Sequence, residues 1–177
     1  MTKTNKKGFT IIEVVLVLAI AGLIFLMVFI ALPALQRSQR NTRRRQDMAR
    51  ILSAFNDYAS NNNGKMPAPS KPNALSEDKD STVANTILKD FMDKYVGERT
   101  SDQRLDPDGT IYTLKYVGVK NATTKPSSAS SFDHVIYYYR KAACDTVEGQ
   151  VKQGNGENEI AIFYYLEGGA IYCGDNS

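Results

Sequence analysis

The sequence is poor in the residues on which enzymes and metal sites most often depend. Its 177 residues include one histidine, two cysteines and no tryptophan. It has no Cys-x-x-Cys pair, and its histidine, His134, stands alone in a strand-like run without a Ser-His-Asp constellation. Gly154-Asn155-Gly156 lacks the Lys-Ser/Thr that completes a phosphate-binding loop. The sequence therefore predicts no catalytic site and no cofactor, and we expect a protein that is not an enzyme.

Charge is almost absent from the N-terminal segment. Between Phe9 and Leu35 the only charged residue is Glu13, and Val14–Leu32 is an apolar run interrupted only by Gly22. As a helix rising about 1.5 Å per residue, this run spans roughly 28 Å, close to the thickness of a hydrocarbon core. It is longer than the apolar part of a cleaved secretory signal, and no clear small-residue cleavage site follows it. We therefore expect a retained transmembrane helix.

Positive charge flanks this run on both sides. Lys3, Lys6 and Lys7 account for the whole net charge of +3, because 19 basic and 19 acidic residues remain without residues 1–8. The balance does not favour a nucleic-acid partner. Five arginines follow the run, so the positive-inside rule alone does not decide the orientation. The cysteines suit an oxidising exterior, and we expect residues 1–8 inside the cell and residues 36–177 outside.

The junction between the lysines and the apolar run has a specific pattern. Lys6-Lys7-Gly8-Phe9-Thr10-Ile11-Ile12-Glu13 resembles the class III signal of type IV pilins and pseudopilins, and the resemblance covers residues 6–30. It implies that a prepilin peptidase cuts between Gly8 and Phe9, and that Phe9 is then N-methylated. It also implies that Glu13, fifth in the mature chain, takes part in assembly. Beyond residue 64 the resemblance is architectural.

A physical argument supports this role for Glu13. A carboxylate in hydrocarbon costs several kcal/mol unless it is paired. Cleavage after Gly8 would create a cationic amine on Phe9 at a similar depth, and the amine of one subunit could pair with Glu13 of the next. The alternative is a plain signal anchor that tolerates a glutamate near its end. The long match to the signal favours assembly through Phe9 and Glu13.

Helical periodicity continues beyond the apolar run, and we expect one helix from about Thr10 to Asn62. Gly64 is a suitable residue for ending it. An amphipathic stripe in the second half of this helix would pack on the chain's own globular domain. The stripe consists of Met48, Ile51, Leu52, Phe55 and Tyr58. The predicted parts are a leader peptide (1–8), a transmembrane and filament-core helix (9–35), the amphipathic half of that helix (36–63) and the globular domain (64–177).

The globular domain reads as a loop at 65–80, a short helix at Ser81–Val96 capped by Asp80 or Ser81, and then strands. Asp106-Pro107-Asp108-Gly109 fits a type I turn. The predicted fold class is α+β, with a long N-terminal helix packed on a small antiparallel sheet of three or four strands, as in type IV pilins. The expected strands are Thr110–Val119, His134–Arg140, Glu159–Leu166 and Ala170–Cys173, the last two joined by a hairpin at Glu167-Gly168-Gly169.

Two further sets of residues are candidate sites. Cys144 and Cys173 enclose the final hairpin, and we predict a disulfide between them rather than two buried thiols. Arg37, Arg40 and Arg44 repeat at helical spacing and could contact lipid headgroups or acidic groups of a neighbouring subunit. A solvated helix face is the plain alternative, and DNA is a weak one.

Two other motifs have simpler explanations. Asp102, Asp106 and Asp108 suggest calcium, which some pseudopilins bind, but the turn accounts for the Asp-Pro-Asp-Gly run without an ion, and we predict no metal site. Asn121-Ala122-Thr123 is a formal glycosylation sequon in a Ser/Thr-rich loop. It permits surface glycosylation and does not by itself predict it.

The resemblance implies a structural subunit of an extracellular type IV pilus, used for adhesion, motility or DNA uptake. Its expected partners are further copies of itself, the prepilin peptidase, an inner-membrane assembly platform and minor pilins. We expect a single-pass precursor in the cytoplasmic membrane and then an extracellular filament. The alternative is a major pseudopilin of type II secretion or competence, because the run from Asp106 to Tyr112 resembles the Asp-Pro-x-Gly-x-x-Tyr of that group. A minor tip adhesin is a third reading, which the lack of an enlarged C-terminal domain disfavours.

Overall fold

A computed structural model describes residues 8–70, 72, 74–75, 83–98, 101–119, 133–146 and 150–177. Lys6 and Lys7 of the signal, the predicted caps Asp80 and Ser81, and the sequon at 121–123 lie outside these residues. The chain divides into two compact units, Met1–Gln39 and Arg40–Ser177. Each unit is described by itself.

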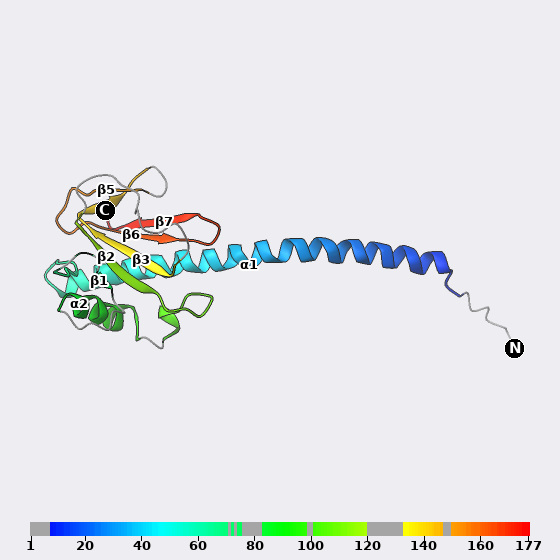
Figure 1. The fold of residues 1–177 in the computed structure, drawn as a ribbon, viewed down its shortest axis with the longest axis horizontal. Coiled ribbons are helices and arrows are strands. Elements are labelled where there is room, and N and C mark those ends of the chain that lie inside the picture. The colour runs from blue at the N-terminus through cyan, green and yellow to red at the C-terminus, as the bar shows by residue number, and fades with distance from the viewer. Residues whose placement is uncertain are drawn as a thin grey trace. The chain divides into compact units, whose positions relative to one another are not determined.

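A single helix, α1, contains most of the N-terminal third of the chain. It runs over Ile11–Asn61, which confirms the predicted helix to within one residue at each end (Figure 1). Its end follows from Gly64, whose φ of 76° suits glycine and whose amide donates to the Ala59 carbonyl at 2.8 Å. Pro33 lies inside α1 and has no N–H for the helical bond to the carbonyl four residues earlier.

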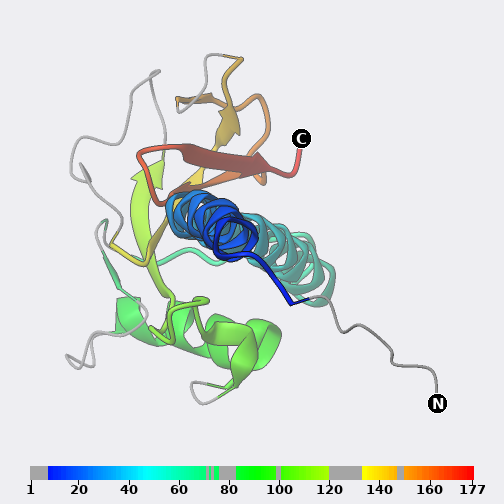
Figure 2. The ribbon, with the colours of Figure 1, turned by 90° about the vertical axis from the view of Figure 1, so that its right-hand side faces the viewer.

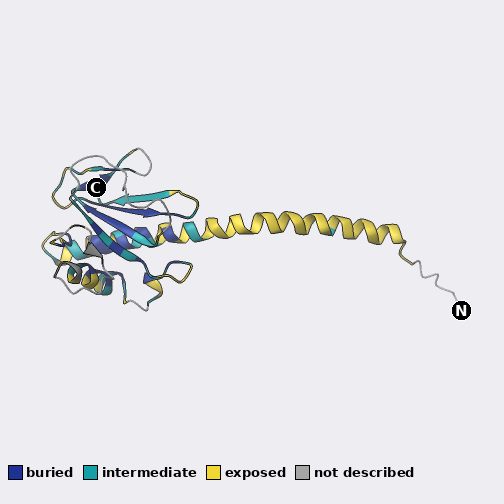
Figure 3. Cartoon of the chain, viewed as in Figure 1, coloured by how far each residue is buried: buried dark blue, intermediate teal, exposed yellow. Residues whose placement is uncertain are grey.

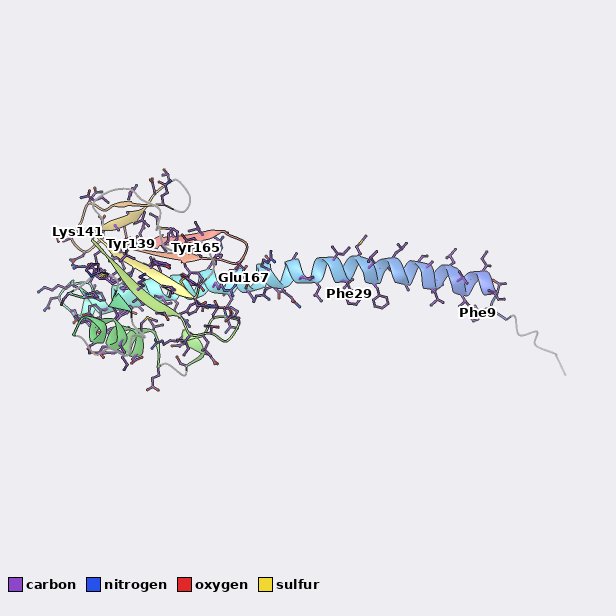
Figure 4. All side chains as sticks on the ribbon, in the orientation of Figure 1. Phe9, Phe29, Tyr139, Lys141, Tyr165 and Glu167 are labelled. Carbon is purple, nitrogen blue, oxygen red and sulfur yellow. A yellow bond between two sulfur atoms is a disulfide. The ribbon has the colours of Figure 1, made fainter. Side chains whose placement is uncertain are left out.

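The part of α1 in the first unit is apolar and exposed on all sides. Figure 3 colours nearly all of it as exposed. The side chains of Phe9, just before the helix, and of Phe29, within it, are 90% and 71% exposed and extend away from the backbone (Figure 4). Among the described residues, α1 is the one helix long and apolar enough to cross a membrane. Exposed apolar surface of this extent is unfavourable in water, so this unit requires lipid or other protein around it.

The second unit contains a five-stranded sheet with the order β1-β2-β3-β6-β7. All neighbouring pairs are antiparallel except β2 and β3, which are parallel. The wholly antiparallel sheet expected from the sequence is therefore wrong for this pair. The 15 residues between the two strands are long enough for the crossover that parallel strands need. The strands are β1 (Ala74–Leu75), β2 (Thr113–Val119), β3 (Val135–Arg140), β6 (Ile160–Tyr165) and β7 (Ile171–Asp175).

Three smaller elements complete this unit. The strands β4 (Ala142–Cys144) and β5 (Val151–Gln153) form a separate antiparallel pair that the sequence did not predict. The predicted short helix is confirmed over α2 (Val83–Phe91), but it continues as a wider π turn, Met92–Val96. The strand β5 lies near the top of the second unit in Figure 1 and α2 near the bottom, and in Figure 2 the orange strands and the green helix are again on opposite sides.

The central strands are buried on both faces, which explains their nearly continuous apolar sequences. In β3, Ile136 and Tyr138 pack in the core that contains α1 and α2, whereas Tyr137 and Tyr139 face the core that contains β4 and β5. This alternation follows from the two-residue repeat of a strand. The β6 strand divides in the same way. Its residues Ile160, Ile162 and Tyr164 belong to the first core, and Ala161, Phe163 and Tyr165 belong to the second.

Candidate functional site

The first turn of α1 holds Glu13 through its own chain. One carboxylate oxygen of Glu13 accepts hydrogen bonds from the backbone N–H and the hydroxyl of Thr10, both at 2.8 Å. The Glu13 amide lies 3.4 Å from the Thr10 hydroxyl oxygen, so the two residues form a reciprocal capping box. The sequence contains this signal as Thr10-Ile11-Ile12-Glu13, and the sequence-based interpretation missed it. Glu13 therefore stabilises the helix start, and its role in assembly stays a prediction.

The predicted cleavage bond precedes α1. Gly8 and Phe9 lie outside regular secondary structure, and both residues are exposed. A side-chain carbon built on Gly8 would meet no other atom within 4 Å. Among the described residues, nothing restricts a side chain at position 8, so a requirement for glycine there would come from the predicted cleavage.

Arg44 is completely buried in the second unit and makes a bidentate ion pair with Asp106. Its Nε and Nη2 atoms donate to the two carboxylate oxygens of Asp106, each at 2.6 Å. Its Nη1 donates to Glu167 Oε1 at 2.5 Å and to Asn41 Oδ1 at 3.2 Å. These bonds and charges raise the pKa of Arg44 against the opposing effect of burial. The predicted lipid or inter-subunit contact is therefore wrong for Arg44.

Glu167, which begins the turn between β6 and β7, joins the same cluster. Arg40 donates to its two carboxylate oxygens at 2.8 and 2.7 Å. The hydrogen bonds from Arg40 lower the pKa of Glu167 to about 2, with a further contribution from Arg44 and against the effect of burial. Asn41 fixes the backbone of Glu167, donating to its carbonyl at 3.0 Å and accepting from its amide at 3.1 Å. We call Arg40, Arg44, Asp106 and Glu167 the ionic cluster (Figure 4 labels Glu167).

The ionic cluster corrects how the arginine stripe was interpreted. Arg40 is paired with Glu167 within its own chain but stays partly exposed, so its predicted external contact stays a prediction. Arg37 is exposed in the first unit, and its contact stays a prediction. The helical spacing could have placed Arg44 correctly. Arg44 lies four, seven and eleven residues before three buried positions and therefore on the same face of α1. These positions are Met48, Ile51 and Phe55.

The predicted turn that contains Asp106 is confirmed by a hydrogen bond from the Gly109 amide to the Asp106 carbonyl at 2.8 Å. Gly109 has a φ of 89°, which a residue with a side chain rarely adopts. The Asp106 carboxylate also accepts from the Tyr164 hydroxyl and from the Asp108 amide, each at 3.1 Å. These bonds explain how a carboxylate with no solvent-accessible surface can stand at the start of the turn.

His134 is not alone, and the expectation that it lies within a strand is wrong. It precedes β3 with a φ of 59°, and its Nε2 lies 2.6 Å from Asp108 Oδ2. Burial alone would raise the pKa of Asp108, but the contact with His134 and the hydrogen bond from the Thr110 amide lower it to about 2. The ligand atoms of Asp106, Asp108 and His134 lie within 4.8 Å of one another.

This trio does not fit a metal ion. Both oxygens of Asp106 already accept hydrogen bonds from Arg44, and a cation there would lie beside a buried guanidinium. Asp102, the third aspartate of the calcium alternative, is not among the converging residues and begins a short 3₁₀ helix, Asp102–Arg104. The trio is therefore better explained as an internal ion-pair network.

The predicted disulfide between Cys144 and Cys173 is confirmed, with Cα atoms 5.9 Å apart. It connects β4 of the small sheet to β7 at the edge of the large one. The amide of Cys144 also donates to the Asp175 carboxylate at 2.6 Å. The hydrogen bond and the disulfide together connect the small sheet to β7 of the large sheet.

Comparison with known proteins informs only the N-terminal segment. Residues 3–29 match the model of the prokaryotic N-terminal methylation motif. No curated protein matches the chain, and no solved structure matches it. The motif, together with the long apolar helix, supports a type IV pilin or pseudopilin-type precursor that is anchored in a membrane and later assembled.

Proposed function

We propose that this chain is the precursor of a structural subunit of an extracellular type IV pilus. The prepilin peptidase cuts it between Gly8 and Phe9, Phe9 becomes N-methylated, and the mature chain polymerises through α1. The match of residues 3–29 to the methylation motif is the observation that carries this proposal. The chain acts as a building unit in this scheme, and not as an enzyme.

The exposed apolar surface of the first unit supports polymerisation. Large apolar side chains from Phe9 to Leu35 are between 44% and 90% exposed. This surface must be covered both before and after assembly. Lipid covers it in the precursor, whose N-terminus lies on the cytoplasmic side. Other copies of the same helix cover it in the filament, which an inner-membrane assembly platform and minor pilins help to build. Both environments satisfy the same requirement for burial of apolar surface.

The first turn gives the assembly step a specific chemistry. In the uncut chain, Thr10 holds the Glu13 carboxylate through two hydrogen bonds to one of its oxygens. The same carboxylate has further lone pairs with which to accept from a cation. Cleavage supplies that cation as the amine of Phe9, and pairing with the amine of an adjacent subunit favours the assembled state over the single subunit in lipid.

The intact mass of subunits purified from cells tests this proposal. We expect a chain that begins at Phe9 and carries one methyl group. A matched sample from cells without the peptidase should retain residues 1–8. A mature chain that still contains Met1 to Gly8 would refute processing at this bond and would return the segment to a plain signal anchor.

The alternative is a major pseudopilin, favoured by the run Asp106-Pro107-Asp108-Gly109-Thr110-Ile111-Tyr112. In this chain Asp106 pairs with Arg44, and the buried Tyr112 donates to Asp47 at 3.1 Å. Both ends of the run therefore have structural tasks in the second unit, tasks that either type of filament would need. Electron microscopy at natural expression separates the two, because long surface filaments support a pilus and their absence from cells that contain processed subunit supports a pseudopilus.

A further inference from the structure

The sequence contains two Asn-Gly dipeptides, Asn63-Gly64 and Asn155-Gly156, and both asparagines are exposed. Such dipeptides can modify themselves, because glycine has no side chain to hinder attack of its backbone nitrogen on the preceding side-chain amide. The attack requires that the glycine nitrogen lose its proton and approach the asparagine Cγ atom. Two identical dipeptides in one chain therefore allow the effect of the fold to be separated from the effect of the sequence.

The fold protects the first dipeptide. The Gly64 amide donates to the Ala59 carbonyl at 2.8 Å as part of the end of α1. Asn63 has a φ of 54°, and the Lys65 amide donates to Asn62 at 3.1 Å, so the backbone on both sides of the Gly64 nitrogen is held. This nitrogen can attack Asn63 only after the helix end opens.

The second dipeptide lies in the loop between β5 and β6, where the hydrogen bonds leave the glycine nitrogen available. Glu159 holds the loop from both sides: its carboxylate accepts from the Asn155 amide at 2.7 Å, and its own amide donates to the Gly156 carbonyl at 3.3 Å. Among the hydrogen bonds between described residues, none uses the Gly156 amide. The loop is thus folded around the dipeptide without engaging the atom that reacts.

The Glu159 side chain lies close to the same peptide bond. A side-chain carbon built on Gly156 would lie 3.3 Å from the Oε1 atom of Glu159, so this carboxylate stands beside the Gly156 backbone. A side chain at position 156 would therefore crowd the side chain of Glu159. The carboxylate accepts from the Asn155 amide and not from the Gly156 amide, so hydroxide or buffer base must remove the Gly156 amide proton as the ring forms.

We propose that Asn155 is a site of spontaneous deamidation in the folded protein and that Asn63 is not. The Gly156 nitrogen attacks Cγ of Asn155, a new C–N bond forms, and the C–NH₂ bond breaks. Ammonia leaves with the amide proton, and a cyclic succinimide remains. Water then opens the ring at either carbonyl and gives aspartate or isoaspartate at position 155.

The product changes the charge and the backbone of this loop. It adds a carboxylate beside Glu157 and Glu159, and Glu157 already pairs with Lys141. The isoaspartyl form also adds one backbone atom between the two groups that Glu159 holds, which changes the spacing on which its two hydrogen bonds depend. The deamidation reaction does not depend on the proposed function. Only the accumulation of its product on an assembled, long-lived filament rests on that function.

The test uses the purified full-length chain in detergent with its disulfide intact, incubated in mildly alkaline buffer. Samples are reduced and digested with trypsin at successive times. Cleavage after Arg50, Lys65 and Lys152 places the two dipeptides on separate peptides, Ile51–Lys65 and Gln153–Ser177. Mass spectrometry then gives the fraction converted at each asparagine. A reduced and urea-unfolded sample provides the matched reference.

In the folded protein we expect Asn155 to convert about tenfold faster than Asn63 or more, because only Asn63 must await local opening. In the unfolded sample the two rates should become similar. An Asn155→Gln variant should lose the fast conversion and keep the slow one. Equal rates in the folded protein, or the same rate difference after unfolding, would overturn the proposal. Neither outcome bears on processing at Gly8, which the intact mass of cellular subunits decides separately.

Discussion

The guanidinium of Arg44 and the carboxylate of Asp106 face each other through two hydrogen bonds of 2.6 Å, with neither side chain accessible to solvent. The two residues are 62 positions apart in the chain. A bidentate pair of this kind is directional, whereas the apolar contacts of Met48, Ile51 and Phe55 on the same face of α1 are not. The pair therefore specifies how this part of α1 is placed on the turn at 106–109.

Replacing Arg44 with methionine should lower the free energy of unfolding by about 3–5 kcal/mol, because it leaves the Asp106 carboxylate buried and uncompensated. Urea unfolding of the full-length chain measures this. Arg43→Met is the matched control, since Arg43 is the adjacent residue and is exposed, and it should change stability by about 0.5 kcal/mol or less. In the double variant Arg44→Met/Asp106→Asn part of the loss should return. Equal effects of the Arg43 and Arg44 substitutions would show that the buried pair is unimportant.

The dependence of stability on pH should reveal Glu167. Its pKa in the folded protein is about 2, below the ordinary value of 4.5, so the stability it contributes is complete above pH 4.5 and is lost as the pH falls toward 2. The difference in urea midpoint between the wild type and Glu167→Gln should therefore be constant near neutrality and shrink through this window. The pKa of Asp108 is also lowered to about 2, but its contribution to the pH dependence is the same in both proteins and cancels in the difference. A difference that does not change with pH would exclude this role.

Removing the disulfide should destabilise the second unit by about 3–4 kcal/mol according to the loop-entropy estimate. The Cys144→Ala/Cys173→Ala variant should show faster hydrogen exchange in β4, β5 and β7, and little change in the buried residues of α1. Cys173→Ala alone is the control, because it breaks the same link while one thiol remains. In the wild type, labelling of denatured and unreduced chain should find no reactive thiol, and two reactive thiols would contradict the pairing.

Glu13 caps the start of α1, and substitutions can separate this cap from its predicted role in assembly. Glu13→Gln keeps an oxygen that can accept from Thr10, and so keeps the capping box, but it removes the charge. If the charge pairs with the Phe9 amine of an adjacent subunit, both Glu13→Gln and Glu13→Val should be processed normally and should form few and short filaments. Glu13→Asp should be intermediate, because its charge remains and its reach is shorter. Electron microscopy gives filament number and length, and a blot for mature subunit in the membrane controls for processing. Normal filaments from Glu13→Gln would leave the carboxylate with a capping role only.

Much of this structure could be inferred from local patterns in the chain. The apolar run, the amphipathic stripe that follows it and Gly64 together predict α1 almost to the residue, because helix formation depends on neighbours three and four positions apart. The same holds for the hairpin of β6 and β7, whose turn residues stand next to its strands. The capping box is equally local, because Thr10 and Glu13 are only three residues apart.

Two features that were predicted wrongly, the direction of β2 relative to β3 and the role of Arg44, depend on contacts between distant segments. Nothing in the sequence of β2 or β3 states that they run parallel, since the repeat of a strand is the same in either direction. The side chains of Arg40 and Arg44 repeat at helical spacing whether they face lipid, water or protein. Their acceptors lie in two turns far along the chain, at Asp106 and Glu167. An arginine finds its partner only when the fold brings a carboxylate to it, and a charge without such a partner stays in water, so the burial of Arg44 was set by packing and not by its local sequence.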